Sequence, residues 1–229
     1  MYVTAIVLAA GEGLRLKSKV PKPLVKINSK PLIIYSLSTL SKHPYIKDII
    51  VVVNQRNLKD IRDKIKQYRI GKVRAIVLGG RLRQDSVFNG LKNMDSRTDT
   101  VLIHDAARPF AANKLVSSLI KAARAYGAAI AGVPVKATIK KIRSGNKKIK
   151  AVDKTIERNT LWEIHTPQVF KKDLILMAYE KFGNIGVTDD AMLVEKLKKN
   201  VRVVLGAYNN IKITTPDDLM IARAIAKGL

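Results

Sequence analysis

The first residues able to do chemistry form a small-residue loop near the N-terminus, followed by two cations. Residues 9–13 read Ala-Ala-Gly-Glu-Gly after an apolar run, and Arg15 and Lys22 come next. Small residues let the backbone wrap closely around a phosphate chain, with its N–H groups as donors. Arg15 and Lys22 would add the positive charge that phosphoryl transfer requires. The loop therefore predicts a site for the phosphates of a nucleotide.

Two common nucleotide-binding motifs are excluded in this loop. No third glycine follows Gly11 and Gly13 to complete a dinucleotide-binding fingerprint, and no Gly-Lys-Ser or Gly-Lys-Thr completes a P-loop. A Gly-x-Gly turn alone is weak evidence, because strand-to-helix turns use glycine for purely steric reasons. The kind of chemistry must therefore be inferred from this loop together with residues farther along the chain.

The elements that would position this loop alternate along the chain. Apolar runs of strand length are mostly continuous, which is typical of strands buried on both faces of a parallel sheet. Their alternation with stretches of helical period predicts an α/β fold, with a mostly parallel twisted sheet and helices on both faces, in a single domain of residues 1–229. Ligands of such sheets bind beyond the carboxyl ends of the strands. Predicted strands cover residues 3–8, 49–53, 73–78, 101–103, 128–133 and 201–205, and predicted helices cover residues 32–41, 58–68, 84–93, 113–126, 189–198 and 216–226.

Residues 137–158 interrupt this alternation. Two β-like stretches, residues 138–143 and 149–152, flank the turn signal Ser-Gly-Asn at residues 144–146. They predict a protruding β-arm. Because an isolated two-stranded arm is only marginally stable in water, we expect it to dock on another surface, most simply that of a second subunit.

Composition excludes several classes of protein. The chain has 229 residues and 47% hydrophobic content, enough for a substantial core, and it has no cysteine and three histidines. Disulfides and thiolate chemistry are excluded, and a metal site would have to use carboxylates and phosphates. No apolar run reaches about 18 residues, and Met1 leads into a strand-like run rather than a signal peptide. We expect a cytoplasmic protein without membrane association.

The charge balance is strongly basic. Lys and Arg number 43 against 18 Asp and Glu, a formal net charge of +25, which predicts attraction to polyanions. A nucleic-acid binder would concentrate this charge and interleave aromatic residues, but the lysines are spread along the whole chain and aromatic residues make up 5%. We therefore expect no specific nucleic-acid partner. A non-catalytic nucleic-acid or nucleotide-binding protein is kept as the alternative from another class.

Five further blocks identify a family. The strand, the small-residue loop, Arg15 and the Pro21-Lys22 pair together resemble nucleotide-sugar pyrophosphorylases and cytidylyltransferases. The other blocks, with the loop, resemble the 2-C-methyl-D-erythritol 4-phosphate cytidylyltransferase family in particular, in the expected order and over nearly the whole chain. The blocks are Gly79-Gly80 with Arg83-Gln84-Asp85-Ser86-Val87, His104-Asp105-Ala106-Ala107-Arg108-Pro109, Thr166-Pro167-Gln168-x-Phe170, Thr188-Asp189-Asp190-Ala191, and Asn210-Ile211-Lys212-Ile213-Thr214.

The resemblance implies a reaction. The phosphate of the acceptor, 2-C-methyl-D-erythritol 4-phosphate, would attack the α-phosphorus of CTP and release pyrophosphate. Since that phosphate is already anionic, no general base is required, and positioning and positive charge would be the main catalytic devices. Ribitol 5-phosphate cytidylyltransferase is the alternative within the class. Ala106-Ala107 between Asp105 and Arg108 favours the methylerythritol family.

The resemblance also implies the residues of the site, a homodimer and a magnesium ion. Arg158 and Thr166 would reach the acceptor from the second subunit, and Asp105 would hold Mg²⁺, which prefers hard oxygen ligands. The implied catalytic residues are Arg15, Lys22, Arg158 and Lys212; the implied nucleotide contacts are Ala9, Ala10, Gly11, Gly13, Arg15, Lys22, Gly80, Ser86, Asp105 and Ala106; and the implied acceptor contacts are Asp105, Arg108, Thr138, Arg158, Thr166 and Lys212.

Simpler structural roles stay open for several of these residues. Ser86, which we expect to begin a helix, would either contact the nucleotide or cap that helix. Asp105 could instead pair with Arg108, and Arg158 with Glu157. Lys212 could be a plain edge-strand lysine. We expect His104 to be a packed strand residue outside the site.

Overall fold

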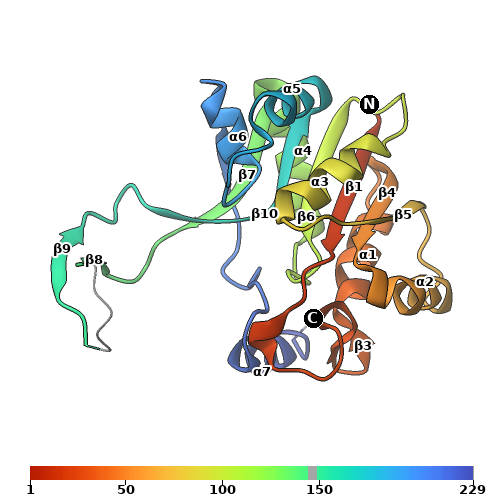
Figure 1. The fold of residues 1–229 in the computed structure, drawn as a ribbon, viewed down its shortest axis with the longest axis horizontal. Coiled ribbons are helices and arrows are strands. Elements are labelled where there is room, and N and C mark those ends of the chain that lie inside the picture. Colours follow the sequence, from red (N-terminus) through yellow and green to blue (C-terminus); the bar gives the residue numbers. More distant parts are fainter. Residues whose placement is uncertain (144–148, 229) are drawn as a thin grey trace.

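A seven-stranded sheet forms the centre of the protein in the computed structural model, which describes residues 1–143 and 149–228 (Figure 1). Strand β10 runs antiparallel to its neighbours β6 and β7, and the remaining pairs in this sheet are parallel. The predicted mostly parallel sheet is thus confirmed. In the order β11-β7-β10-β6-β1-β4-β5, the strands are Arg202–Leu205, Ala128–Pro134, Trp162–Lys171, Thr100–Asp105, Val3–Ala9, Ile46–Val53 and Val73–Leu78.

Helices cover both faces of this sheet, as predicted. Alternate residues of β1 point to opposite faces: Val7 belongs to the apolar cluster that includes residues of α1, α2 and α4, whereas Ile6 belongs to the cluster that includes residues of α3, α5 and α6. Continuous apolar strands are required because both faces are buried. The helices are α1 Leu32–Lys42, α2 Leu58–Gln67, α3 Arg83–Lys92, α4 Asn113–Tyr126, α5 Lys172–Phe182, α6 Ala191–Lys196 and α7 Pro216–Ile225.

Two adjoining elements were not predicted from the sequence. Strand β10 is interrupted by a register shift between His165 and Gln168, and it contains Pro167, a residue that normally argues against a central strand. Helix α5 follows β10 at once, with Lys171 as its N-cap residue and no side-chain cap. Neither a clean alternation nor a capping residue therefore marks the boundary between them.

A third layer lies beyond the carboxyl ends of the central strands. The short pair β2 (Lys26–Ile27) and β3 (Lys30–Pro31) packs with α7 through a separate apolar cluster that includes Leu16, Phe110 and Ile213. Among the described residues, short 3₁₀ turns follow two of the central strands: η1 Leu14–Leu16 and η2 Lys22–Leu24 follow β1, and η3 Gln55–Asn57 follows β4.

Among the described residues, β8 (Ile139–Ile142) and β9 (Val152–Ile156) form a separate antiparallel pair, which projects from the body of the protein in Figure 1. The second strand begins later than the predicted residues 149–152. The pairing of Ile142 with Val152, and not the apolar pattern of the sequence, determines where it begins. The predicted turn at residues 144–146 lies outside the described residues.

No helix within residues 1–143 and 149–228 combines the length and the hydropathy that a membrane-spanning segment needs.

The packing of α3 on the sheet generates a stability prediction at Gly90. A Cβ at this position would lie 2.6 Å from Cγ2 of Ile6, a fully buried side chain with little freedom to move. Gly90→Ala should lower the midpoint of thermal unfolding, because overpacking costs about 1–3 kcal/mol against a helix-propensity gain of about 1 kcal/mol. Gly186→Ala is the control, since no atom lies within 4 Å of its added Cβ. A higher midpoint for Gly90→Ala than for the wild type would contradict this packing.

Candidate active site

A cavity of about 820 Å³ lies where the carboxyl ends of four neighbouring parallel strands meet. Its walls come from the loops after β1, β4, β5 and β6 and from the segment that precedes α7. This is the edge at which an open α/β sheet binds its ligands. The predicted site residues that line it are Ala9, Ala10, Gly11, Gly13, Arg15, Lys22, Gly80, Ser86, Asp105, Ala106 and Lys212.

Gly11 and Gly13 of the first loop are small for different structural reasons. Gly13 has a left-handed backbone, with φ 68°, and a Cβ there would lie 2.6 Å from Cβ of Lys22. Only glycine allows both the turn and the close approach of the lysine stem. At Gly11, by contrast, an added Cβ would meet no atom within 4 Å, so this stretch of backbone borders open space in the cavity.

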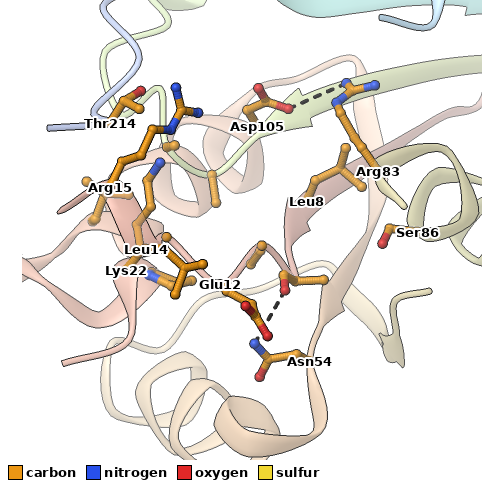
Figure 2. A pocket seen from close by; sticks show the side chains of 18 of the residues that line it. Leu8, Glu12, Leu14, Arg15, Lys22, Asn54, Arg83, Ser86, Asp105 and Thr214 are labelled. Carbon is orange, nitrogen blue, oxygen red and sulfur yellow. Dashed lines mark hydrogen bonds and ion pairs between the residues drawn. The ribbon is translucent and has the colours of Figure 1, made fainter. Parts of the chain in front are cut away.

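Three cations converge on the cavity: Arg15 and Lys22 come from the segment after β1, and Lys212 comes from the segment before α7. Figure 2 shows the side chains of Arg15 and Lys22 extending into the same region. The pKa of Lys22 is lowered to about 8, first by burial and then by the positive charge of Lys212, with a smaller contribution from Arg15. The three side chains therefore act on one another electrostatically before any ligand binds.

Packing below the cavity explains why these segments meet. Leu16 follows Arg15, Ile213 follows Lys212, and both side chains are buried in one apolar cluster with Phe110. The Ile213 N–H also donates to the Ala107 carbonyl at 2.9 Å. The apolar neighbours of the cations are thus what bring the cations together.

Asp105 ends β6 and supplies negative charge to this basic site. Its Oδ2 lies 2.6 Å from Lys212 Nζ, and its Oδ1 lies 3.4 Å from Nη2 of Arg83. Burial alone would raise the pKa of Asp105, but the charges of Arg83 and Lys212 outweigh that effect and hold the pKa well below its usual range. The carboxylate is therefore ionised at neutral pH, and its partners are Lys212 and Arg83 rather than Arg108.

A buried relay fixes the backbone of Asp105. Burial lowers the pKa of His104 to about 4, so the ring is neutral and carries one N–H. Nε2 lies 3.0 Å from the Arg108 carbonyl, which can only accept, so Nε2 carries the proton and Nδ1 accepts from the Thr166 hydroxyl at 3.0 Å. The same hydroxyl oxygen accepts the Asp105 N–H at 3.0 Å. His104 and Thr166 thus position Asp105.

Ser86 lines the cavity, and its expected contact with the nucleotide stays a prediction. Helix α3 begins at Arg83, so Ser86 lies inside its first turn and does not begin it. Its hydroxyl accepts the Gly80 N–H and donates to the Leu82 carbonyl, both at 3.2 Å. Asp85 accepts the Leu82 N–H at the helix start. Ser86 therefore shapes the Gly80 loop at the cavity wall.

Thr166 and Arg108 do not line the cavity in the single chain. Thr166 is buried, and its hydroxyl takes part in the relay to Asp105. Arg108 is also buried, and it donates to the carbonyls of Asn210 at 2.8 Å and Ile164 at 3.4 Å. Their expected contacts with the acceptor stay predictions, and both side chains also have structural partners.

The two predicted arm residues lie apart from the cavity in the single chain. Thr138 and Arg158 are exposed at the base of the β8–β9 pair, and neither lines the cavity. Arg158 donates to the Lys136 carbonyl, and Glu157 accepts the Asn159 N–H. A ligand in this cavity could be contacted by these residues only through a neighbouring subunit.

Arg83 is a cavity residue that was not singled out from the sequence. Arg83 is the first residue of α3, lines the cavity and contacts Asp105. Arg83 belongs to one of the blocks that carry the family resemblance, but the residue types and spacing in that block do not indicate which residues it contacts.

Comparisons with known proteins decide the family. The family model described as "IspD: 2-C-methyl-D-erythritol 4-phosphate cytidylyltransferase" matches residues 3–228. The chain belongs to this family. A 2-C-methyl-D-erythritol 4-phosphate cytidylyltransferase of Shouchella clausii is 44% identical over 230 residues, covering 99% of this chain and 97% of the relative. One of Syntrophus aciditrophicus is 44% identical over 228 residues, covering 98% and 96%.

Solved structures of family members have the same fold. The 4-diphosphocytidyl-2C-methyl-D-erythritol synthase of Anaerococcus prevotii matches with a TM-score of 0.85 and 36% identity, covering 99% of this chain and 96% of that one. The cytidylyltransferase of Thermus thermophilus matches with a TM-score of 0.78 and 27% identity, covering 99% and 100%. The family members therefore share both the sequence pattern and the sheet that carries the cavity.

The residues at the cavity wall are compatible with a magnesium ion only if phosphate supplies most of its ligands. Among the described residues, no group of three or more His, Asp or Glu side chains could hold a metal ion by itself. Asp105 offers one ionised carboxylate at the cavity wall, and Mg²⁺ commonly binds one or two carboxylates together with substrate phosphates. The expected metal role of Asp105 is compatible with this donor set.

The relay predicts a structural effect at Thr166. Thr166→Val keeps the shape of the side chain but leaves the Asp105 N–H and His104 Nδ1 unpaired in the interior, at about 1–3 kcal/mol each. The midpoint of thermal unfolding should fall, and Thr166→Ser should recover most of it. If Thr166→Val unfolded like the wild type yet lost substrate affinity, the hydroxyl would face substrate and the relay would be wrong.

Proposed function

We propose that this chain transfers the cytidylyl group of CTP to 2-C-methyl-D-erythritol 4-phosphate and releases pyrophosphate, a step of the non-mevalonate route to isoprenoid precursors. The observation that carries the proposal is the convergence of Arg15, Lys22 and Lys212 on one cavity beside a small-residue loop. Membership of the family supports the choice of nucleotide and acceptor. We propose that the enzyme works in the cytoplasm.

The first loop would hold the triphosphate. Its backbone borders open space at Gly11, and Arg15 and Lys22 extend over the same region (Figure 2). During transfer, negative charge builds on the oxygens around the α-phosphorus and on the departing pyrophosphate. Cations that are already in place stabilise that charge without reorganising at the moment of reaction. Arg15 and Lys22 are therefore assigned to the transition state.

Lys212 would hold the phosphate of the acceptor. One direction of its ammonium group is fixed by Asp105 at 2.6 Å, which leaves its other N–H groups for an incoming phosphate. That phosphate is the nucleophile and is ionised at neutral pH, so no side chain has to remove a proton. Lys212 lowers the repulsion between the two substrates and aligns them. Bound Mg²⁺, held by Asp105 and phosphate oxygens, would neutralise further charge on the triphosphate.

A homodimer would complete the acceptor pocket with Thr138 and Arg158 of the neighbouring arm. Supporting this, the arm exposes apolar side chains, with Ile142 41% and Val152 49% exposed, and the edge strand β11 exposes Leu205 at 65%. Large apolar side chains at an arm and at an open sheet edge are typical of surfaces that another chain covers.

Loss of either cation of the first loop should cripple turnover. Arg15→Ala and Lys22→Ala should each lower kcat/KM by two orders of magnitude or more, on the order of 3 kcal/mol for a lost transition-state contact. Release of pyrophosphate from CTP and 2-C-methyl-D-erythritol 4-phosphate measures the effect. Lys19→Ala is the matched control, because Lys19 is exposed in the same loop and does not line the cavity. Turnover of ribitol 5-phosphate alone would refute the proposed acceptor.

The lowered pKa of Lys22 predicts a pH dependence. Below about pH 8 the ammonium is charged and attracts the triphosphate, whereas above that pH the free enzyme loses the charge. The value of kcat/KM for CTP should therefore fall as pH rises through this range. Lys22→Arg keeps its charge at all these pH values, so its profile should lack this fall. A fall of the same size in Lys22→Arg would assign it to another group.

Mixing inactive subunits tests the contribution of the arm. Lys22→Ala and Arg158→Ala homodimers should each be nearly inactive, but an equal mixture that exchanges subunits should regain roughly a quarter of wild-type activity, because each mixed dimer assembles one intact site. Controls are the same variants unmixed. Continued inactivity after proven subunit exchange would mean that Arg158 acts within its own chain or not at all.

A further inference from the structure

Two of the sequence blocks meet behind the cavity in a group that the reaction described so far does not use. Arg83 lines the cavity wall, and its Nη2 lies 2.8 Å from Oδ2 of Asp190, a side chain with no exposure to solvent. The Tyr179 hydroxyl donates to the other oxygen, Asp190 Oδ1, at 2.6 Å. A continuous set of contacts therefore runs from Tyr179 through Asp190 and Arg83 to Asp105.

A buried carboxylate in this place needs a reason. Burying an ionised carboxylate is unfavourable unless it is paired, and apolar side chains commonly stabilise an interior as well as a buried ion pair does. Asp190 does not serve as a helix cap: it is the N-cap residue of α6 by position, but its side chain makes no capping hydrogen bond. The neighbouring Asp189 instead accepts the Met192 N–H at 3.1 Å. Asp190 points inward to Arg83.

The distances show how the guanidinium of Arg83 is divided between two carboxylates. Nη2 is 2.8 Å from Asp190 but 3.4 Å from Asp105, so the Asp190 carboxylate holds it more closely. Arg83 thus supports Asp105 on one side while Lys212 contacts it at 2.6 Å on the other. Nη2 makes the contacts with both carboxylates, and Arg83 also lines the cavity. A guanidinium has five N–H donors, so Arg83 keeps donors beyond those of Nη2.

We infer that Asp190 and Tyr179 anchor Arg83 from behind the cavity, and that the anchored Arg83 positions Asp105 and offers its remaining N–H groups to the phosphates of the nucleotide. The inference rests on the proposed function, since the site being positioned is the CTP site. Asp190 and Tyr179 are positioning residues, because they act only through Arg83. Without the anchor, Arg83 would close onto Asp105 and compete there with Lys212 and with the ligand.

A double-mutant cycle on CTP binding tests the anchor. Dissociation constants for CTP are measured by calorimetry for the wild type, Asp190→Asn, Arg83→Ala and the double variant. Asp190→Asn should weaken binding about tenfold, and in the Arg83→Ala background it should add less than about twofold, because the anchor has nothing left to hold. Additive losses would show a merely structural role and overturn the inference.

A matched control separates anchoring from general damage at the same turn. Asp189 accepts from the side-chain amide of Gln168 and from the Met192 N–H, and Asp189→Asn keeps an acceptor for only one of these donors. The variant leaves the pair of Arg83 and Asp190 intact, so it should lower the midpoint of thermal unfolding and leave CTP binding within about twofold. If Asp190→Asn fails to fold, Tyr179→Phe takes its place in the cycle, with an expected loss of about threefold and the same lack of additivity. Unchanged CTP binding in Tyr179→Phe or Asp190→Asn would overturn the anchor.

The outcomes for the anchor and for the proposed function are distinguishable. A wild-type protein that binds and turns over CTP, with variants that bind it equally well, would overturn only the anchor. A wild-type protein that binds no CTP would overturn both.

Arg83→Lys adds a further readout. The lysine keeps one positive charge but cannot reach two carboxylates and the cavity at once, so KM for CTP should rise more than kcat falls.

Discussion

The protein depends on holding like charges together in one cavity before any phosphate arrives. Lys22 shows the strain of this arrangement: burial, Lys212 and Arg15 all disfavour its charged form and lower its pKa. Asp105 opposes the repulsion, because its carboxylate stays ionised between Arg83 and Lys212 although it is buried. Two phosphates entering such a cavity replace repulsion between the cations with attraction. Catalysis by charge that is already in place follows from this.

Apolar packing holds the cations together against their mutual repulsion. The cations come from the loop after β1 and from the segment before α7, and they meet because Leu16 and Ile213 share an apolar cluster beneath them. The buried relay from His104 through Thr166 fixes the backbone of Asp105 in the same way. Hydrophobic burial is roughly proportional to area and indifferent to the charges above it, so it can hold a repulsive arrangement in place.

Much of this could be predicted from the sequence, because local patterns determine it. Continuous apolar runs located the parallel strands, and the small residues after β1 located a loop that lines the cavity. Strand β10 was not predicted, because Pro167 and a register shift interrupt its alternating pattern, although the strand lies in the middle of the sheet. A strand position of this kind is set by its neighbours, not by its own residues.

The structural partners of the site residues could not be predicted, for a related reason. The sequence places Thr166 and Arg108 in motifs, but the groups that each side chain contacts in the fold are distant along the chain, such as Asn210 for Arg108. The same holds for Arg83, whose role becomes visible only when Asp190 is found beside it. Residue type and spacing predict which groups gather, whereas burial decides which of them can touch a ligand.

The first loop and its cations are proposed to hold the triphosphate, and a crystal structure of the protein with CTP is the decisive experiment. We expect triphosphate density along residues 9–15, with the ammonium of Lys22 and the guanidinium of Arg15 in contact with its oxygens. A triphosphate bound elsewhere, or a nucleotide that leaves both side chains in solvent, would contradict it.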